Sequence, residues 1–295
     1  MSDAVLDVFD CHRKLLHGVA YRILGSVDEA DDVVQETWLR WHRADRAAVA
    51  DPRAYLVRIA TRAAFDHIRR AASRRETYVG AWLPEPMLTE PDIAEDAALA
   101  DSISMAMLVL LQTLSPLERA VFVLKEAFGF TYPQISDAIG RSDQAVRQLA
   151  HRARQHIQAR QPRFDADRNV SRTVTERFMK AAIGGDLAAL LSVLAPEVTL
   201  IADSGGKTPG PRRPIHGAEK VARFFAATAD NIPTGTLMRI VDINGGPGAL
   251  TLLGATPYAA FSFHVGARTE RIQTIHLISN PDKLTRLELD NQRAV

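Results

Sequence analysis

The sequence of 295 residues has one cysteine, Cys11, and no apolar run as long as a membrane-spanning helix. A single thiol excludes an internal disulfide and a cysteine-based metal cluster. We expect neither a metal site nor a cofactor in this protein. We expect Cys11 to be a small apolar residue packed inside the first helix. The amino-terminal segment also lacks the charged and then apolar pattern of a signal peptide. These absences favour a cytoplasmic protein that does not contact a membrane.

Lysine and arginine are missing from residues 77–118, although the whole chain has a net charge of +1. This stretch is acidic instead, and strongly basic segments lie on either side of it, at 66–75 and 147–163. Two basic segments separated by an acidic one favour two contacts with a single polyanion. Two solvated helix faces would give the same composition, so this observation by itself leaves both interpretations open.

Apolar residues at helical spacing predict helices over most of residues 5–72 and again from 94 to 157. Helix-start signals stand at Ser26, at Asp51 before Pro52, and at Ser115 before Pro116. Residues 78–92 contain one glycine and three prolines, which predicts a linker between the two helical regions. This linker carries large apolar side chains, so we expect it to pack on another part of the protein.

The pattern changes after about residue 170. One predicted helix at 171–194 is followed by strand-like runs at 197–203, 237–243, 249–254, 259–265 and 271–279. Glycine and proline turns separate these runs, and residues 159–169 read as a second linker. Helices first and strands afterwards predict a separate α+β domain with an antiparallel sheet.

The stretch "GRSDQAVRQLAHRARQHI" at 140–157 combines a glycine turn, a cap at Ser142, an apolar stripe and a polar, basic face. A short helix precedes it, which is the pattern of a helix-turn-helix whose second helix lies in the major groove of DNA. Arginine pairs with guanine and glutamine with adenine, while further arginines hold phosphates. The predicted DNA-contacting residues are Arg141, Ser142, Gln144, Arg147, Gln148, His151, Arg152 and Arg154.

The stretch from "LSPLERAVFVLKEAFG" through this helix resembles region 4 of the extracytoplasmic-function sigma factors of bacterial RNA polymerase. In that family this helix-turn-helix reads the promoter −35 element. "AYRILGSVDEADDVVQETWLRW" resembles the region 2 helices that dock on the polymerase, and "DPRAYLVRIATRAAFDHIRR" resembles the part that reads the −10 element. The resemblance implies two partners, promoter DNA and core RNA polymerase, the latter through its β′ clamp and β flap.

An acidic edge beside an apolar face suits a basic protein partner better than DNA. The residues predicted to bind the polymerase are Asp28, Asp31, Asp32, Val34, Gln35, Glu36, Trp38 and Leu39. The next helix presents basic side chains that suit DNA phosphates, and the residues predicted to bind the −10 element are Arg58, Arg62, His67, Arg69 and Arg70.

Three further motifs, "WLPEP", "DSGGK" and "NPDKL", resemble signatures of the sigma factors that carry a fused SnoaL-like domain with the cone-shaped α+β fold of the NTF2 superfamily. The resemblance implies that this domain regulates the sigma domains, through Trp82, Leu83, Pro84, Glu85, Pro86, Asp203, Gly205, Gly206, Lys207, Asn280, Pro281, Asp282, Lys283 and Leu284. The commoner motif has glycine at Ser204, which leaves the shape of that loop open. The expected domains are 1–75 (region 2), 76–108 (acidic linker), 109–163 (region 4) and 170–295 (SnoaL-like).

Two alternatives remain for the whole chain and for its last domain. The chain could be an ordinary helix-turn-helix regulator, although such a protein needs no polymerase-binding helix at 28–41. The last domain could bind a small ligand in its cone, or be an enzyme with acid and base groups among Asp203, His216, His264 and His276. We expect a regulator without catalytic residues.

Overall fold

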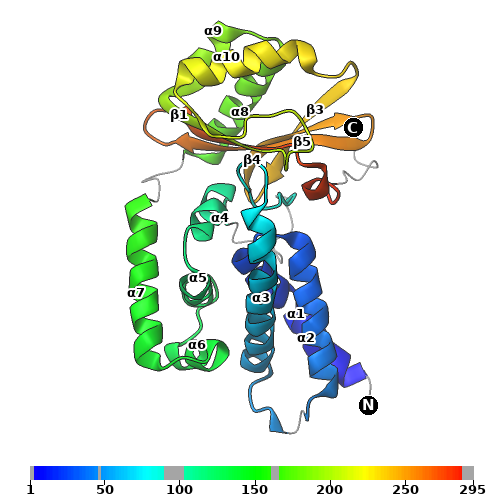
Figure 1. Ribbon diagram of the computed structural model, residues 1–295, viewed down its shortest axis with the longest axis vertical. Helices are drawn as coiled ribbons and strands as arrows, with labels where there is room; N and C mark the ends of the chain where they lie inside the picture. Colours follow the sequence, from blue (N-terminus) through cyan, green and yellow to red (C-terminus); the bar gives the residue numbers. More distant parts are fainter. Residues whose placement is uncertain (1–2, 46–47, 90–102, 161–165, 288–295) are drawn as a thin grey trace. The chain divides into compact units, whose positions relative to one another are not determined.

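The computed structural model describes residues 3–45, 48–89, 103–160 and 166–287 (Figure 1). These residues divide into two compact units. The first contains the described residues up to 76, residue 103 and residues 107–160, and the second contains residues 77–89, 104–106 and 166–287, so that the start of α4 belongs to the second unit and the rest of it to the first. Most of the expected acidic segment, with Glu90, Asp92, Glu95, Asp96 and Asp101, lies outside the described residues. Within the described ranges, no helix has the length and apolar character needed to cross a bilayer.

The first unit begins with three packed helices, α1 (Asp3–Leu24), α2 (Val27–Arg43) and α3 (Pro52–Glu76). Gly25 has a positive φ of 76° and turns the chain between α1 and α2. Ser26 then caps α2 by accepting a hydrogen bond from the Glu29 amide, and the Asp51 carboxylate accepts one from the Ala54 amide at the start of α3. Both predicted helix starts are confirmed.

The second part of this unit contains α4 (Met105–Gln112), α5 (Pro116–Phe122), the π-helix η2 (Val123–Ala127), α6 (Tyr132–Ile139) and α7 (Asp143–Arg160). Ser115 and Glu118 form a reciprocal capping box at the start of α5, which confirms the predicted helix start at Ser115. Gly140 ends α6 in the left-handed conformation, with φ 66° and ψ 44°. The short helix, glycine turn and long basic helix predicted from the sequence are therefore present.

The second unit is an α+β domain, which confirms the predicted fold class. Its elements are α8 (Arg168–Ile183), α9 (Leu187–Val193), β1 (Leu194–Asp203), β2 (Ile215–His216), α10 (Ala218–Thr228), η3 (Ala229–Asn231), β3 (Thr236–Ile243), β4 (Gly246–Leu253), β5 (Thr256–Gly266), β6 (Arg271–Ile278) and η4 (Pro281–Lys283). The six strands form one sheet in the order β2-β1-β6-β5-β4-β3. Helices α8, α9 and α10 cover one face of it (Figure 1). The core includes Phe178 and Phe225, and the partly buried Phe263 packs against it.

Three expectations for the second unit are corrected. The sheet is mixed, because β1 pairs with β6 in parallel while the other pairs are antiparallel. Local sequence patterns predict where strands lie but not which strands pair with each other. The pairing of β1 with β6, the last strand, is set by the tertiary fold. The single helix expected at 171–194 is two helices, because Gly185 turns the chain with φ 65°. The helix α10 and the two-residue strand β2 were not predicted.

Cys11 is exposed on α1, so the expectation of a buried apolar residue is wrong. The buried residues of α1 include Phe9, Leu16, Val19 and Ile23, which share one helix face. Cys11 is two positions from Phe9, and two steps of about 100° place it on the opposite side of the helix.

Candidate DNA-contacting helices and the linker site

Helix α7 presents a polar face that is exposed along its length. Its buried side is formed by Val146, Leu149, Ala150, Ala153 and Ile157, as the apolar stripe predicts. Three exposed side chains are spaced four and then three residues apart, so they lie along one line of the helix surface: Gln144, Gln148 and His151. Gln155 continues this line and is also exposed, although it was not among the predicted residues.

Two arginines of the predicted set lie at the edges of this face and are held by acidic side chains. Arg152 forms an ion pair with Glu118 of α5 at 3.1 Å, and Arg154 forms one with Glu126 of η2 at 2.7 Å. A hydrogen bond from the Ser115 hydroxyl lowers the pKa of Glu118, and the hydrogen bond to Glu126 raises the pKa of Arg154. The two ion pairs orient the guanidinium groups along the margins of the polar face.

Arg147 is exposed and stacks over the Tyr132 ring, with 4.6 Å between its guanidinium carbon and the ring centroid. Lys125 also lies over this ring, with its ammonium nitrogen 5.0 Å from the centroid. The ring therefore positions two cations beside α7 through cation–π attraction.

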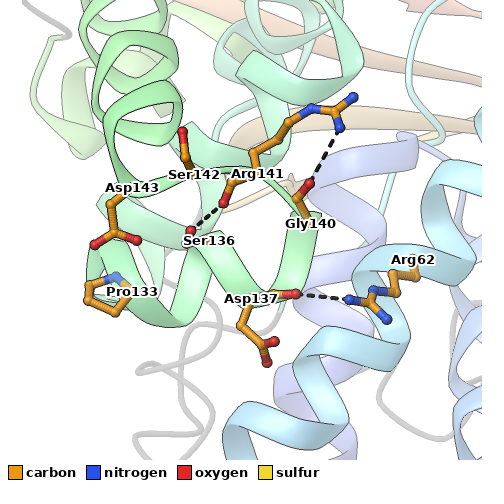
Figure 2. Close-up of a pocket in the computed structure, with 8 residues that line it drawn as sticks. All are labelled: Arg62, Pro133, Ser136, Asp137, Gly140, Arg141, Ser142 and Asp143. Carbon is orange, nitrogen blue, oxygen red and sulfur yellow. Dashed lines mark hydrogen bonds between the residues drawn. The ribbon is translucent and has the colours of Figure 1, made fainter.

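A pocket of about 470 Å³ lies at the turn that leads into α7 (Figure 2). It is lined by Arg62, Pro133, Ser136, Asp137, Gly140, Arg141, Ser142 and Asp143. Ser142 caps α7 by accepting a hydrogen bond from the Ala145 amide, as predicted. Arg62 comes from α3, so this pocket joins the two helical parts of the first unit.

The predicted polymerase-binding residues lie on α2 in two environments. Asp28, Asp31, Asp32, Gln35 and Leu39 are exposed, and Leu39 is a large apolar side chain that is 51% exposed. By contrast, Val34 is buried, Trp38 packs edge-to-face on Phe9, and Glu36 lies near Arg40 and His67. The exposed group combines four polar or acidic side chains with one apolar side chain, and its contact with the polymerase stays a prediction.

The five residues predicted to bind the −10 element are also placed differently along α3. Arg62, Arg69 and Arg70 are exposed, and Arg69 pairs with Asp66 one turn away. Arg58 is partly exposed, and both it and Arg62 bond to α6. His67 is buried, with its imidazole Nε2 3.5 Å from a Glu36 carboxylate oxygen. A contact between His67 and DNA therefore stays a prediction. In this structure the imidazole ring of His67 faces Glu36 of α2.

The linker packs on the second unit through a buried polar cluster, here called the linker cluster, made of Tyr78, Leu83, Asp203, Asn280 and Lys283. The fully buried Asp203 carboxylate accepts hydrogen bonds from the Leu83 amide at 2.8 Å and the Lys283 ammonium at 2.7 Å. It also accepts one from the Tyr78 hydroxyl, which in turn accepts one from the Asn280 side chain at 2.8 Å. The motifs "WLPEP", "DSGGK" and "NPDKL" therefore meet at one place.

Lys283 is the second charge of the linker cluster. Its ammonium group donates to the Leu83 carbonyl and lies 4.0 Å from the centroid of the Trp82 ring. Burial and the neighbouring Asp203 carboxylate raise the pKa of Tyr78, so its hydroxyl stays protonated and keeps donating. Every charge here is matched by an opposite charge or a hydrogen bond, as a buried ion pair requires.

The glycines of "DSGGK" allow the close contacts of this site. Gly205 and Gly206 have φ values of 58° and 72°. A Cβ atom at Gly205 would lie 2.5 Å from the Asn280 side-chain nitrogen, and one at Gly206 would lie 3.0 Å from Val79. Ser204 needs no positive φ, and its hydroxyl accepts a hydrogen bond from the Gly206 amide, so serine fits where glycine is commoner.

The linker makes a second contact at the edge strand β3. Leu88 forms an antiparallel bridge with Ile243, and the Thr89 amide donates to the Asp242 carbonyl at 2.9 Å. The Asn244 amide donates to the Met87 carbonyl at 2.8 Å. The linker thus extends the sheet at β3, which confirms that it packs.

The remaining motif residues surround the linker cluster, some at the surface and some buried. Lys207 pairs with Asp282, and both side chains are more than half exposed. Leu284 is buried beside the motif, and Pro281 begins η4. Tyr78, which precedes the "WLPEP" motif, was missed because only its place in the fold shows that it bonds to Asp203.

The four candidate acid and base groups of the second unit lie in three environments, and only the two buried histidines are close to each other. Asp203 belongs to the linker cluster, and His216 is exposed on β2, where it bonds to Thr199. His264 on β5 and His276 on β6 are both buried. Burial, with a smaller contribution from His264, lowers the pKa of His276 to about 4. His276 is therefore neutral at pH 7.

Comparisons with known proteins agree with this geometry. Residues 8–74 match the family model of sigma-70 region 2, and residues 104–157 match that of sigma-70 region 4. The ECF RNA polymerase sigma factor SigJ of Mycobacterium tuberculosis (strain H37Rv) is 38% identical over 297 residues, which cover 97% of this chain and 95% of SigJ. The probable ECF RNA polymerase sigma factor SigI of Mycobacterium tuberculosis (strain CDC 1551) is 38% identical over 199 residues, which cover 66% of this chain and 69% of SigI.

The crystal structure of Mycobacterium tuberculosis SigJ matches this structure with a TM-score of 0.74 and 33% identity, covering 95% of this chain and 98% of the other. The similarity extends across both units, including the SnoaL-like second unit. The chain therefore belongs to the extracytoplasmic-function family of RNA polymerase sigma factors.

Proposed function

We propose that this sigma factor binds core polymerase through α2, the −10 element through α3 and the −35 element through α7, and that its SnoaL-like unit regulates it in cis. The observation that carries the regulatory part is the linker cluster. A segment that lies between the two helical regions in sequence is held by a buried ion pair of the SnoaL-like unit. The state of that contact determines whether residues 78–89 are docked or free.

The polymerase contact is proposed for the exposed residues of α2. Carboxylates beside exposed Leu39 suit a basic protein surface that has an apolar pocket, which is the chemistry proposed for the β′ clamp. The β flap is the proposed second contact, made by the region 4 helices. Neither contact needs a catalytic group on this chain.

Transcription with purified core polymerase tests this function. The full-length protein should direct initiation at a specific promoter, and Leu39→Asp should reduce the yield about tenfold or more by placing a charge in an apolar contact. Leu6→Asp is the matched control, since Leu6 is 45% exposed on α1 and lies outside the proposed contact. Absence of promoter-specific initiation on every template, also after removal of residues 280–295, would disprove the sigma-factor function.

The promoter contacts of α7 predict different effects for two of its arginines. Arg147→Ala should weaken binding to a specific promoter by about 1–3 kcal/mol, because its guanidinium is exposed beside the base-reading line. Arg154→Ala should weaken binding to all DNA about equally, because Glu126 holds it at the margin of the helix, where phosphates lie.

Fluorescence anisotropy on wild-type and −35-mutant DNA separates these two effects. Holoenzyme is titrated with both DNAs at one stated salt concentration, since phosphate contacts depend strongly on salt. An equal loss on both DNAs for Arg147→Ala would show that this side chain does not read a base.

The structure favours regulation over catalysis in the SnoaL-like unit. The Asp203 carboxylate accepts hydrogen bonds from Tyr78, Leu83, Lys283 and the Gly205 amide, so it holds the linker and is poorly placed to accept a proton from a substrate. We therefore propose that this unit is not an enzyme. The proposal also requires no small ligand.

A further inference from the structure

We infer that the β3–β4 turn, residues 242–245, is a second docking site for the linker, and that Arg168 at the start of α8 is the positioning residue that holds this site together. The turn bonds to linker residues 87–89 and also to Arg168. All of these residues belong to the second unit. The chain segment before region 4 and the segment after it are therefore tied to the same four residues, and we expect their contacts to be lost together.

The turn is built by an asparagine and a glycine. Ile243 pairs with Gly246, which leaves Asn244 and Gly245 as a two-residue hairpin loop. Their φ values are 51° and 72°, the positive range that these two residue types adopt most readily in such loops. The backbone groups of the loop are not used by the β3–β4 ladder, so they are available to bind other segments.

The linker occupies these groups through hydrogen bonds from both main chain and side chains. The Asn244 amide donates to the Met87 carbonyl at 2.8 Å, and the Met87 amide donates to the Asn244 side-chain oxygen at 3.3 Å. The Gly245 amide donates to the Thr89 hydroxyl at 2.9 Å, and the Thr89 amide donates to the Asp242 carbonyl at 2.9 Å. None of these bonds involves a residue of the linker cluster, so the turn is a separate docking site.

Arg168 binds the same turn from the start of α8. Its guanidinium forms an ion pair with the Asp242 carboxylate and donates to the Gly245 carbonyl at 3.1 Å. The Asp242 side chain is only 4% exposed, and its Oδ1 atom has no hydrogen-bond partner among the described residues. A buried carboxylate requires a compensating charge, and Arg168 supplies it.

Two residues of the turn bond to both segments, which is the physical basis of the coupling. Asp242 binds Arg168 through its side chain and Thr89 through its carbonyl. Gly245 binds Arg168 through its carbonyl and Thr89 through its amide. Without Arg168 the buried carboxylate is uncompensated and moves toward water, which displaces the carbonyl that accepts the Thr89 amide. Because coupling between two contacts is reciprocal, loss of the linker weakens the Arg168 contact by the same factor.

The start of α8 also has contacts that do not involve the turn. The Ala166 amide donates to the Val265 carbonyl at 2.9 Å, and Asp167 caps the helix by accepting a hydrogen bond from the Asn169 amide at 2.8 Å. A substitution of Arg168 therefore leaves α8 anchored and capped while it removes the contact with the turn.

The inference deepens the proposed regulation in cis and rests on it only for the purpose of this docking site. The residues that match region 4, 104–157, lie between the two tied segments in the sequence. The linker cluster holds only the segment before region 4, whereas the turn holds both. Loss of the turn contacts therefore releases both connections of region 4 from one place.

Hydrogen–deuterium exchange of the full-length protein, followed by NMR, tests the coupling. Arg168→Met should increase the exchange rates of the Thr89 and Asn244 amides about fivefold or more, because exchange follows local opening. Thr89→Val removes the hydroxyl that binds Gly245 and should also increase both rates. The double variant should exchange more slowly than the product of the two single effects predicts, since each substitution disrupts the same contact.

Two further variants separate positioning from a general effect on α8. Arg172→Met is the matched control, because Arg172 lies on the same helix, is 50% exposed like Arg168, and pairs only one turn away with Glu176. It should leave both exchange rates unchanged. Arg168→Lys keeps a positive charge for Asp242 and should retain most of the protection. The Phe261 and Leu277 amides of β5 and β6 report whether the sheet stays folded.

Wild-type exchange rates at Thr89 and Asn244 in Arg168→Met would overturn the inference. Strictly multiplicative effects of Arg168→Met and Thr89→Val would also overturn it, since they would show that the two segments are held independently. If Arg168→Met unfolds the sheet, the same cycle with Arg168→Lys decides between these outcomes. Every measurement is made without polymerase or DNA, so failure here leaves the sigma-factor function to be tested by transcription.

Discussion

Asp203→Asn is expected to release the linker and to change transcription output more than any other single substitution in the SnoaL-like unit. The variant leaves the Lys283 ammonium group buried without its carboxylate partner, and breaking a buried pair in this way costs about 3–5 kcal/mol. The linker should then dissociate, since its Leu83 amide and Tyr78 hydroxyl both bond to the lost charge. Limited proteolysis within residues 78–89 measures the release directly.

The exposed pair beside the cluster provides the matched control. Lys207 and Asp282 carry the same charges and come from the same two motifs, but they lie at the surface. Lys207→Met should therefore change linker cleavage little, because exposed pairs contribute about 0–1 kcal/mol. A double variant, Asp203→Asn with Lys283→Met, removes both charges and should recover part of the protection. Equal cleavage of Asp203→Asn and wild type would contradict the role of the cluster.

The SnoaL-like unit is expected to lose stability as the pH falls from 6.5 toward 4, because of His276. The folded state holds this imidazole neutral, with a pKa of about 4 against an ordinary value of 6.5. Between these values the unfolded chain binds a proton that the folded one does not, so the free energy of unfolding decreases as the pH falls. The difference of about 2.5 pKa units corresponds to about 3 kcal/mol, fully lost below pH 4.

Urea unfolding at fixed pH values between 7 and 4 measures this loss, with circular dichroism to follow the sheet. His276→Gln should flatten the pH dependence, because an amide does not titrate. His216→Gln should leave it unchanged, since that ring is exposed on β2 and bonds to a surface threonine. A pH dependence that is the same in wild type and His276→Gln would falsify the assignment.

Local signals in the sequence were sufficient for the helical regions. Caps at Ser26, Asp51 and Ser115, and the glycine that ends α6, depend on contacts within a few residues, so their structural consequences could be predicted from spacing. The apolar stripe of α7 likewise predicted its buried side. The expectation for Cys11 failed because it came from the residue type alone, whereas its position two residues from the buried Phe9 places it off the apolar stripe of α1.

The candidate site divides in the same way. The three motifs could be recognised in the sequence, but their contact with one another in the folded protein could not. Asp203 lies 125 residues from Tyr78 and 80 residues from Lys283, and it bonds to both. The ion pairs that hold Arg152 and Arg154, and the bonds of Arg58 and Arg62 to α6, also join distant segments. The charges near an arginine in the sequence do not specify which distant acidic side chain or carbonyl it will bond to in the folded protein.

The sequence by itself determined the family, the helix-turn-helix with its polar face, and the α+β character of the last domain, because each depends on short-range periodicity or on contiguous motifs. Only the tertiary structure decided that β1 runs parallel to β6, that the linker docks on a buried aspartate and lysine, and that two arginines suited to DNA bond to α6 instead. These features come from the pairing of residues far apart in the chain, which is selected by the packing of the folded units as a whole.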